Sequence, residues 1–227
     1  MSSHSAAERA ALVDALSDAG PHRPTLCAGW TTTELAAHLV ARERRPDSGP
    51  GIMIPALAGW TDRVRRAYAR RPYPDLVQAI RTGPPWTSVL ALPGLDARVN
   101  LLEHFVHCED VRRAYAGEPG WEPRELPAER QAAIWAQLGA VSRRSFRRSP
   151  VLVGLRTPDG RSTPVSGGTA VGDASGGGTA GGGEPVVIVG DPGELALYLF
   201  GRKDHARVQL EGPDDAVNTF RRLTLRV

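Results

Sequence analysis

Titratable side chains are concentrated in residues 100–115, which read NLLEHFVHCEDVRRAY. Glu103, His107 and Asp110 follow the spacing i, i+4 and i+7, so a helix would place them within about 60° of one another. The same side carries apolar residues, and an ionised carboxylate facing a core is costly unless it is paired or bound to a cation. A Glu and a His one turn apart offer an oxygen and a nitrogen to a single point, which favours a metal site.

A structural interpretation of this helix stays open, with Glu103 paired to an arginine and His107 as a satisfied core histidine. A second segment, ELAAHLVARE, places His38 on the buried side of an alanine-rich helix. His38, Glu103 and His107 together form a two-histidine, one-carboxylate set that suits Zn²⁺, Ni²⁺ or Fe²⁺ with positions left open. Asp110 is then expected to orient a ligand histidine as a hydrogen-bond acceptor.

Composition excludes several classes of protein. The chain has 227 residues, a hydrophobic fraction of 41% and a formal charge of +3, and its two cysteines are too few for a disulfide framework. Lys203 is the sole lysine, and the arginine clusters at 63–71 and 143–148 are expected to be solvated helix faces, not a nucleic-acid surface. No apolar run approaches the roughly 20 residues of a membrane span, and no signal-peptide layout is present, so a cytoplasmic protein is expected.

Residues 1–148 are predicted to be helical, most simply an antiparallel bundle. Thr31 and Glu34 show the capping-box spacing at the start of the second helix. The expected helices are 5–18, 31–45, 56–70, 73–83, 96–116 and 127–148.

Residues 151–227 are predicted to form a small α/β domain, which makes the fold class α+β. Strands are expected at 151–157, 184–190, 206–212 and 224–227, with helices at 191–202 and 213–223. The Gly-rich segment 166–183 lacks apolar anchors and is expected to be a flexible loop. It also lacks the Lys-Ser/Thr ending of a phosphate loop.

Three stretches resemble one known family: AGWTTTELAAHLVARERRPDS, LAGWTDRV and NLLEHFVHCEDVRRA. They are similar to the helical domain of the mycothiol-dependent maleylpyruvate isomerase and DinB-like metal-binding superfamily, and to an uncharacterised actinobacterial metal-binding subgroup within it. The resemblance covers roughly residues 5–150 and implies a DinB-like four-helix bundle. It implies that His38, Glu103 and His107 hold the metal, with zinc favoured. The downstream segment GDPGELALYLFGRKDHARVQLEG resembles the C-terminal domain of the superfamily, where an arginine contributes to activity; Arg202 is the matching position.

The resemblance implies an enzyme in which the metal activates a thiol, with mycothiol as the implied cofactor, for isomerisation, thiol transfer or detoxification of a small electrophile. Two alternatives stay open. One is a metal-dependent hydrolase with Asp110 or Glu43 as the base. The other is a non-catalytic metal-binding protein, which a fourth protein ligand such as His104 or Cys108 would favour. Cys108 is expected to be an ordinary buried thiol. The expected partners are a small-molecule substrate and a low-molecular-weight thiol, and the chain is expected to be a monomer or homodimer.

Overall fold

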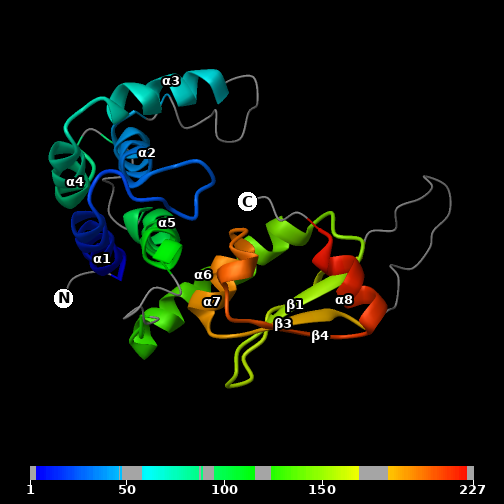
Figure 1. The fold of residues 1–227 in the computed structure, drawn as a ribbon. Helices are drawn as coiled ribbons and strands as arrows, with labels where there is room; N and C mark the ends of the chain where they lie inside the picture. The colour runs from blue at the N-terminus through cyan, green and yellow to red at the C-terminus, as the bar shows by residue number, and fades with distance from the viewer. Residues whose placement is uncertain are drawn as a thin grey trace. The chain divides into compact units, whose positions relative to one another are not determined.

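The fold is α+β, as the sequence predicts. In this computed structural model the described residues are 4–45, 47, 58–86, 88, 95–115, 124–168 and 184–223. They divide into two compact units, Met1–Arg124 and Glu125–Val227. Helices dominate the first unit, and the second contains a small sheet (Figure 1).

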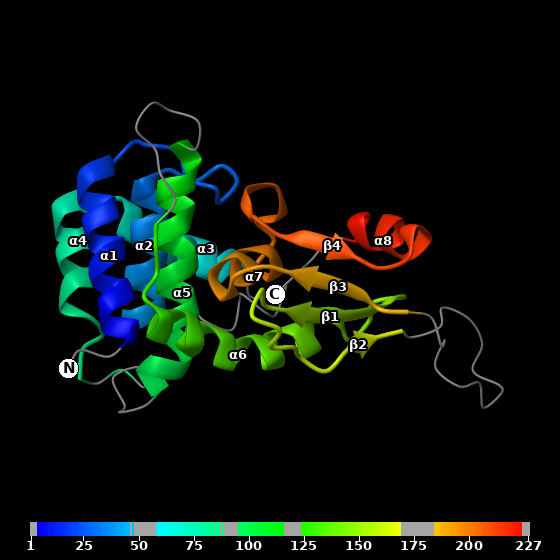
Figure 2. The same ribbon diagram turned by 90° about the horizontal axis from the view of Figure 1, so that it is seen from below.

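The regular elements in the described part of the first unit are all helices. Its elements are α1 (His4–Ala19), α2 (Thr32–Arg44), α3 (Ala58–Ala69), α4 (Tyr73–Thr82), α5 (Leu95–Arg112) and the short 3₁₀ helix η4 (Arg113–Tyr115). Helix α1 packs against α5 and α4, whereas α2 packs against α3 and α4. Figure 2 shows α4, α1, α2 and α5 side by side with their axes nearly aligned. The five helices expected within this unit are therefore all present.

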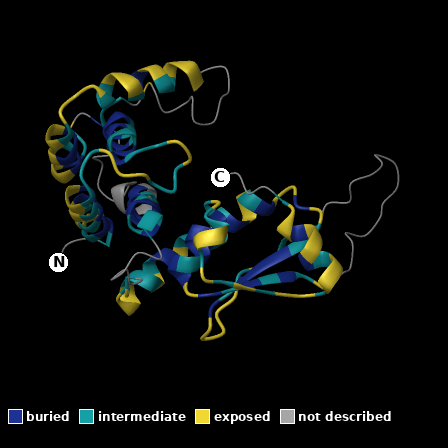
Figure 3. Cartoon of the chain, viewed as in Figure 1, coloured by how far each residue is buried: buried dark blue, intermediate teal, exposed yellow. Residues whose placement is uncertain are grey.

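The start of α2 is fixed by its first turn. The carboxylate of Glu34 accepts a hydrogen bond of 3.0 Å from the backbone N–H of Thr31, which completes the predicted capping box. Helix α2 then turns Leu35, Leu39 and three small alanines inward, which lets neighbouring helices approach closely. Figure 3 shows the buried residues gathered on the inner sides of these helices. The core of this unit includes Leu12, Val13, Leu16, Leu35, Leu39, Leu76, Ile80, Cys108 and Val111.

A four-stranded sheet with flanking helices makes up the second unit. Its elements are α6 (Ala128–Phe146), β1 (Leu152–Arg156), β2 (Ser166–Gly167), β3 (Val186–Val189), α7 (Pro192–Leu199), η5 (Lys203–His205), β4 (Gln209–Glu211) and α8 (Asp214–Arg221). The strand order is β2-β1-β3-β4, with β1 and β3 parallel and both edge strands antiparallel to their neighbours. Three predicted strands and both predicted helices are confirmed. The fourth, 224–227, lies outside the described residues.

Two features differ from the sequence-based expectation. Helix α6 belongs to the second unit, so the units divide ahead of the expected boundary at 148–151. The reason is that α6 packs against the second unit. The ring centroids of Phe146 and Phe220 lie 5.6 Å apart, and the side chain of Gln131 accepts a 3.0 Å hydrogen bond from the N–H of Gly193. In addition, the expected loop 166–183 begins with strand β2, and its residues 169–183 lie outside the described part of the chain.

Candidate metal centre

The three predicted ligand residues come together in the first unit. His38 projects from α2, and Glu103 and His107 project from α5. Oε1 of Glu103 lies 3.4 Å from Nε2 of His38 and 3.4 Å from Nε2 of His107. One donor atom from each of the three residues lies within 4.8 Å of the other two. We call this set the His–Glu–His cluster.

The spacing of this cluster suits a metal ion. Two donors bound tetrahedrally to one ion at about 2.0–2.1 Å lie about 3.4 Å apart, which matches both separations from Glu103. An imidazole–imidazole–carboxylate set fits zinc and related divalent ions. The three side chains keep exposures of 18%, 20% and 12%, in the order His38, Glu103, His107. The three side chains of the cluster are therefore partly buried and keep some solvent exposure.

His38 is positioned by its neighbours on both sides. Leu35, three positions before His38, and Leu39, the next residue, are buried at 0% and 2% exposure and anchor α2 in the core. On the open side the indole of Trp30 packs against the imidazole with ring centroids 5.2 Å apart. The rings of His38 and His107 lie 5.5 Å apart at an angle of 72°. Trp30 thus forms one apolar wall of the cluster.

His107 is held from its other nitrogen. Its Nδ1 lies 2.9 Å from Oδ2 of Asp110, and Asp110 has no exposed surface. A carboxylate bonded to the second nitrogen of a ligand histidine fixes the tautomer and the orientation of the ring. The predicted orienting position of Asp110 is therefore present in the geometry. Because Asp110 is fully buried, direct contact with a substrate is not supported.

Arg42 adds a positive charge beside the carboxylate. Its Nε lies 3.3 Å from Oε1 of Glu103, and its Nη1 donates a 2.5 Å hydrogen bond to Oδ1 of the buried Asn100. Arg42 lies one helical turn after His38 on α2, which explains why both reach Glu103. The guanidinium adds to the hydrogen bonds from His107 and His38 that lower the pKa of Glu103 and so favour the ionised carboxylate that a metal ligand requires.

The pKa directions follow from these contacts. Burial on its own raises the pKa of Glu103, but hydrogen bonds from His107 and His38 and the charge of Arg42 hold that pKa well below its usual value. Burial lowers the pKa of His38, and the neighbouring Glu103 opposes the change only in part. For His107 burial is outweighed by its hydrogen bonds to Asp110, Cys27 and Glu103, which raise the pKa well above its usual value. The cluster thus has one ionised carboxylate between two unlike imidazoles.

Cys27 is a neighbour of the cluster that sequence reasoning missed. Its Sγ donates a 3.2 Å hydrogen bond to Oδ2 of Asp110 and lies 3.9 Å from Nδ1 of His107. Cys27, His107 and Asp110 form a second group whose donor atoms lie within 4.8 Å of one another. Cys27 precedes α2 in a proline-punctuated connection, where no helical periodicity indicates which way a side chain points.

Three other candidates lie away from the cluster. Oε1 of Glu43 lies 2.6 Å from Nη1 of Arg9, with which it forms an ion pair, and 3.6 Å from Nε2 of His104. Glu43 therefore pairs with Arg9 and His104. Cys108 has no exposed surface and belongs to the apolar core, as predicted. Burial raises the pKa of the Cys108 thiol to about 12. The structure therefore disfavours Glu43 as a base and His104 or Cys108 as a fourth ligand.

The opposite side of α5 also carries buried charge. Glu109 has only 2% exposure and pairs with Arg113 at 2.7 Å and with Arg124 at 3.2 Å. Arg124 in turn pairs at 2.7 Å with Glu8, which is fully buried. This buried ion network (Glu8, Glu109, Arg113 and Arg124) ties α1 to α5. It explains why α5 carries more titratable groups than the cluster needs.

Arg202 belongs to the second unit. It precedes η5, and its Nη1 donates a 2.6 Å hydrogen bond to the backbone oxygen of Phe200. Its assignment to the site stays a prediction.

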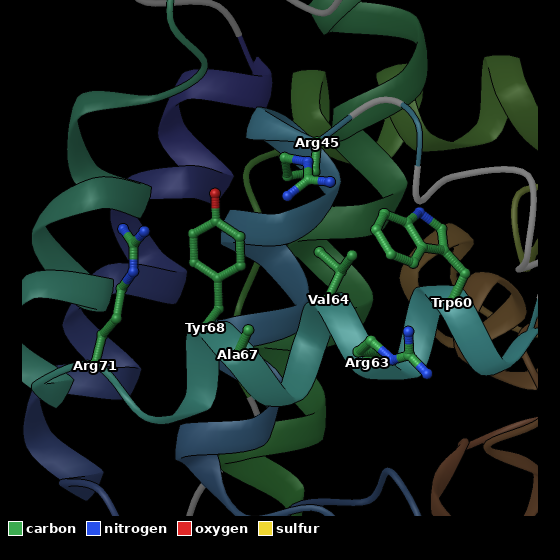
Figure 4. Close-up of a pocket in the computed structure, with 7 residues that line it drawn as sticks. All are labelled: Arg45, Trp60, Arg63, Val64, Ala67, Tyr68 and Arg71. Atoms are coloured by element: carbon green, nitrogen blue, oxygen red, sulfur yellow. The ribbon is translucent and has the colours of Figure 1, made fainter.

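A separate hollow of about 270 Å³ lies along α3 (Figure 4). It is lined by Arg45, Trp60, Arg63, Val64, Ala67, Tyr68 and Arg71. Arg45 donates to both carboxylate oxygens of Asp47, at 2.8 and 2.7 Å, and the indole N–H of Trp60 donates to Asp47 at 3.2 Å. The hollow shares no lining residue with the His–Glu–His cluster.

The fold and the cluster define a class of protein: a helical domain with a group of three metal-ligand-type side chains on two of its helices, followed in the chain by a small α/β unit. Residues 3–83 match the family model described as the mycothiol maleylpyruvate isomerase N-terminal domain. The match supports the resemblance read from the sequence over these residues: this part of the chain is similar to a mycothiol-related domain. The match includes His38 and ends before α5, which carries the other two residues of the cluster.

No curated protein and no solved structure matches the chain. In the described part of the chain, no helix combines the length and the apolar character needed to cross a membrane.

Proposed function

We propose that the chain is a metal-dependent enzyme that uses a low-molecular-weight thiol, mycothiol in the first instance. The reaction class is thiol transfer, isomerisation or detoxification of a small electrophile. The observation that carries the proposal is the convergence of His38, Glu103 and His107, with partial exposure, in a chain whose residues 3–83 match a mycothiol-related domain.

Three residues are proposed to bind the metal ion, and two others to orient or balance the charge of those ligands. His38, Glu103 and His107 are the proposed ligands of one divalent ion, with zinc favoured over nickel or iron. Such an ion lowers the pKa of a thiol that binds at its open position, and so supplies a nucleophilic thiolate at neutral pH. Asp110 holds the Nδ1 proton of His107, and Arg42 balances the charge of Glu103.

Partial exposure favours an enzyme over a closed structural site. A structural zinc site has four protein ligands and admits no substrate, whereas a catalytic site keeps a position for water or substrate. In the described part of the chain, the group of possible metal donors that includes Glu103 has three members, namely His38, Glu103 and His107. Arg202 is proposed to hold an anionic group of the substrate or thiol.

The hydrolase alternative loses support because Asp110 is buried and Glu43 is paired elsewhere.

The test is the absorption spectrum of the Co²⁺-substituted protein during titration with mycothiol. We expect a sulfur-to-cobalt charge-transfer band that saturates at one thiol per ion, because the open position accepts the thiol sulfur. The S-methylated thiol serves as the matched control and should give no band. A d–d spectrum that mycothiol and simple thiols leave unchanged would contradict the use of a thiol and favour hydrolysis or a closed site.

A further inference from the structure

The turn at residues 25–30 is fastened to α5 by two hydrogen bonds to Asp110. The backbone N–H of Leu26 donates a 3.0 Å hydrogen bond to the backbone oxygen of Asp110. The thiol of Cys27 donates to Oδ2 of the same residue at 3.2 Å. Main chain and side chain of the 25–30 turn therefore both dock on the residue that orients His107.

Cys27 and His107 share one acceptor atom. Oδ2 of Asp110 accepts from Nδ1 of His107 at 2.9 Å as well as from Sγ of Cys27. Asp110 is fully buried, and a buried carboxylate is stable only where donors compensate its charge. The thiol is therefore one of the donors that compensate the charge of this carboxylate.

The same turn also reaches the other histidine. The backbone N–H of Trp30 donates a 2.9 Å hydrogen bond to the backbone oxygen of Cys27, and Oγ1 of Thr25 accepts from the N–H of Cys27 at 3.2 Å and donates to the oxygen of Trp30 at 2.9 Å. These bonds hold the turn in which the indole of Trp30 packs against His38, with the two ring centroids 5.2 Å apart. One short turn thus contacts both histidines of the cluster.

We propose that Cys27 is a positioning residue of the metal centre: through Asp110 it holds the imidazole of His107 in the orientation that directs Nε2 to the ion. The proposal rests on the proposed function in requiring that the His–Glu–His cluster binds metal. It goes beyond that function in giving the half-buried cysteine a defined role.

Geometry separates positioning from ligation. The thiol lies on the Nδ1 side of His107, 3.9 Å from that nitrogen, whereas Glu103 lies 3.4 Å from Nε2. The two nitrogens of an imidazole point away from each other, so an ion held at Nε2 with Glu103 does not reach Sγ beside Nδ1. Cys27 therefore acts on the ion only through Asp110 and His107.

Three variants of the full-length chain test the role. Cys27→Ala removes the donor to Asp110, Cys27→Ser keeps a donor, and Cys108→Ala is the matched control because Cys108 lies in the apolar core. Loss of a residue that supports a ligand lowers metal affinity by about 10–100-fold. For Cys27→Ala we expect one Co²⁺ per chain, a Kd about 10-fold weaker and an altered d–d spectrum. Cys27→Ser should recover most of the affinity, and Cys108→Ala should keep the wild-type Kd.

Two results would overturn the proposal. The first is a wild-type Kd and d–d spectrum in Cys27→Ala, which would remove any positioning role. The second is a sulfur-to-cobalt band in the wild-type protein without added thiol that Cys27→Ala abolishes, or a fall from two ions to one in that variant. Either form of the second result would make Cys27 a ligand, in the cluster or in the second group with His107 and Asp110.

A metal-free readout distinguishes this proposal from the proposed function. The imidazole nitrogen shifts of His107 in the apoprotein should change in Cys27→Ala and return towards wild type in Cys27→Ser, because the hydrogen bond to Asp110 is present without the ion. Unchanged shifts in Cys27→Ala would refute positioning even if the wild-type protein binds metal. Changed shifts in a protein that binds no metal would refute the proposed function while supporting the contact.

Discussion

His107 and Asp110 are joined by a 2.9 Å contact between Nδ1 and Oδ2, and this contact leaves Nε2 as the nitrogen that faces Glu103. The two residues lie three positions apart on α5, so the helix itself sets their separation. Because Asp110 is fully buried, its carboxylate cannot turn away to water. The orientation of the proposed ligand is therefore built into a single helix.

Asp110→Asn should weaken metal binding without abolishing it. The amide keeps the shape of the side chain, but it removes the charge that makes His107 a better ligand, so a loss of about 10–100-fold in affinity is expected. The measurement is a Zn²⁺ Kd by competition with a chromophoric chelator. Asp18→Asn on the exposed side of α1 is the control and should leave the Kd unchanged. An unchanged Kd in Asp110→Asn would show that the contact does not tune the site.

The two cysteines should differ sharply in reactivity. Burial raises the pKa of Cys108 to about 12, so at pH 8 only about one part in ten thousand of this thiol is ionised. Below that pKa, the thiolate fraction of Cys108 increases about tenfold per pH unit. Cys27, by contrast, is only half-buried, so a reagent can reach it more easily. With a disulfide reagent on native apoprotein at pH 8 we expect one thiol to react per chain. Cys27→Ser should remove that fast thiol, and equal reaction of both thiols in the native protein would contradict the burial of Cys108.

The buried ion network should contribute far more to stability than an exposed pair. Glu109→Ala removes a carboxylate of 2% exposure that pairs with both Arg113 and Arg124. Breaking a buried ion pair typically lowers the free energy of unfolding by about 3–5 kcal/mol. Asp62→Ala removes partly exposed pairs with Arg65 and Arg66 on α3, for which about 0–1 kcal/mol is expected. The free energy of unfolding in urea measures both. Similar losses in the two variants would show that the network is not the tie between α1 and α5.

Arg202→Ala should leave metal content unchanged, because Arg202 belongs to a different compact unit from the three proposed ligands. If Arg202 holds an anionic group, thiol-dependent turnover should fall. Arg207→Ala in the same unit is the control for a general loss of positive charge. Turnover that is equal in the Arg202→Ala and wild-type proteins would remove Arg202 from the site.

The cluster was predictable because helical spacing carries its geometry. Glu103 and His107 lie one turn apart on α5, and the burial of Leu35 and Leu39 indicates which side of α2 carries His38. The capping-box spacing of Thr31 and Glu34 also predicted the start of α2, because these two residues hydrogen-bond each other locally. These features depend on residues a few positions apart, and the sequence shows such spacings directly.

The features that sequence reasoning missed depend on distant partners. Cys27 meets Asp110 across 83 positions of the chain, and Arg124 meets Glu8 across 116. Helix α6 has a clear apolar side, but periodicity does not indicate whether other helices or the sheet cover it. The two-residue strand β2 is too short to produce an alternating pattern. Tertiary contacts decide each of these cases.

Metal content of the purified protein and its variants tests the central claim most directly. The account predicts about one divalent transition-metal ion per chain in the wild-type protein, and little or none in His38→Ala, Glu103→Ala and His107→Ala. His104→Gln is the matched control, because His104 is adjacent to Glu103 on α5 but faces Glu43, and it should keep its metal. Full occupancy in all three cluster variants, measured by elemental analysis alongside a folded circular-dichroism spectrum, would contradict the account.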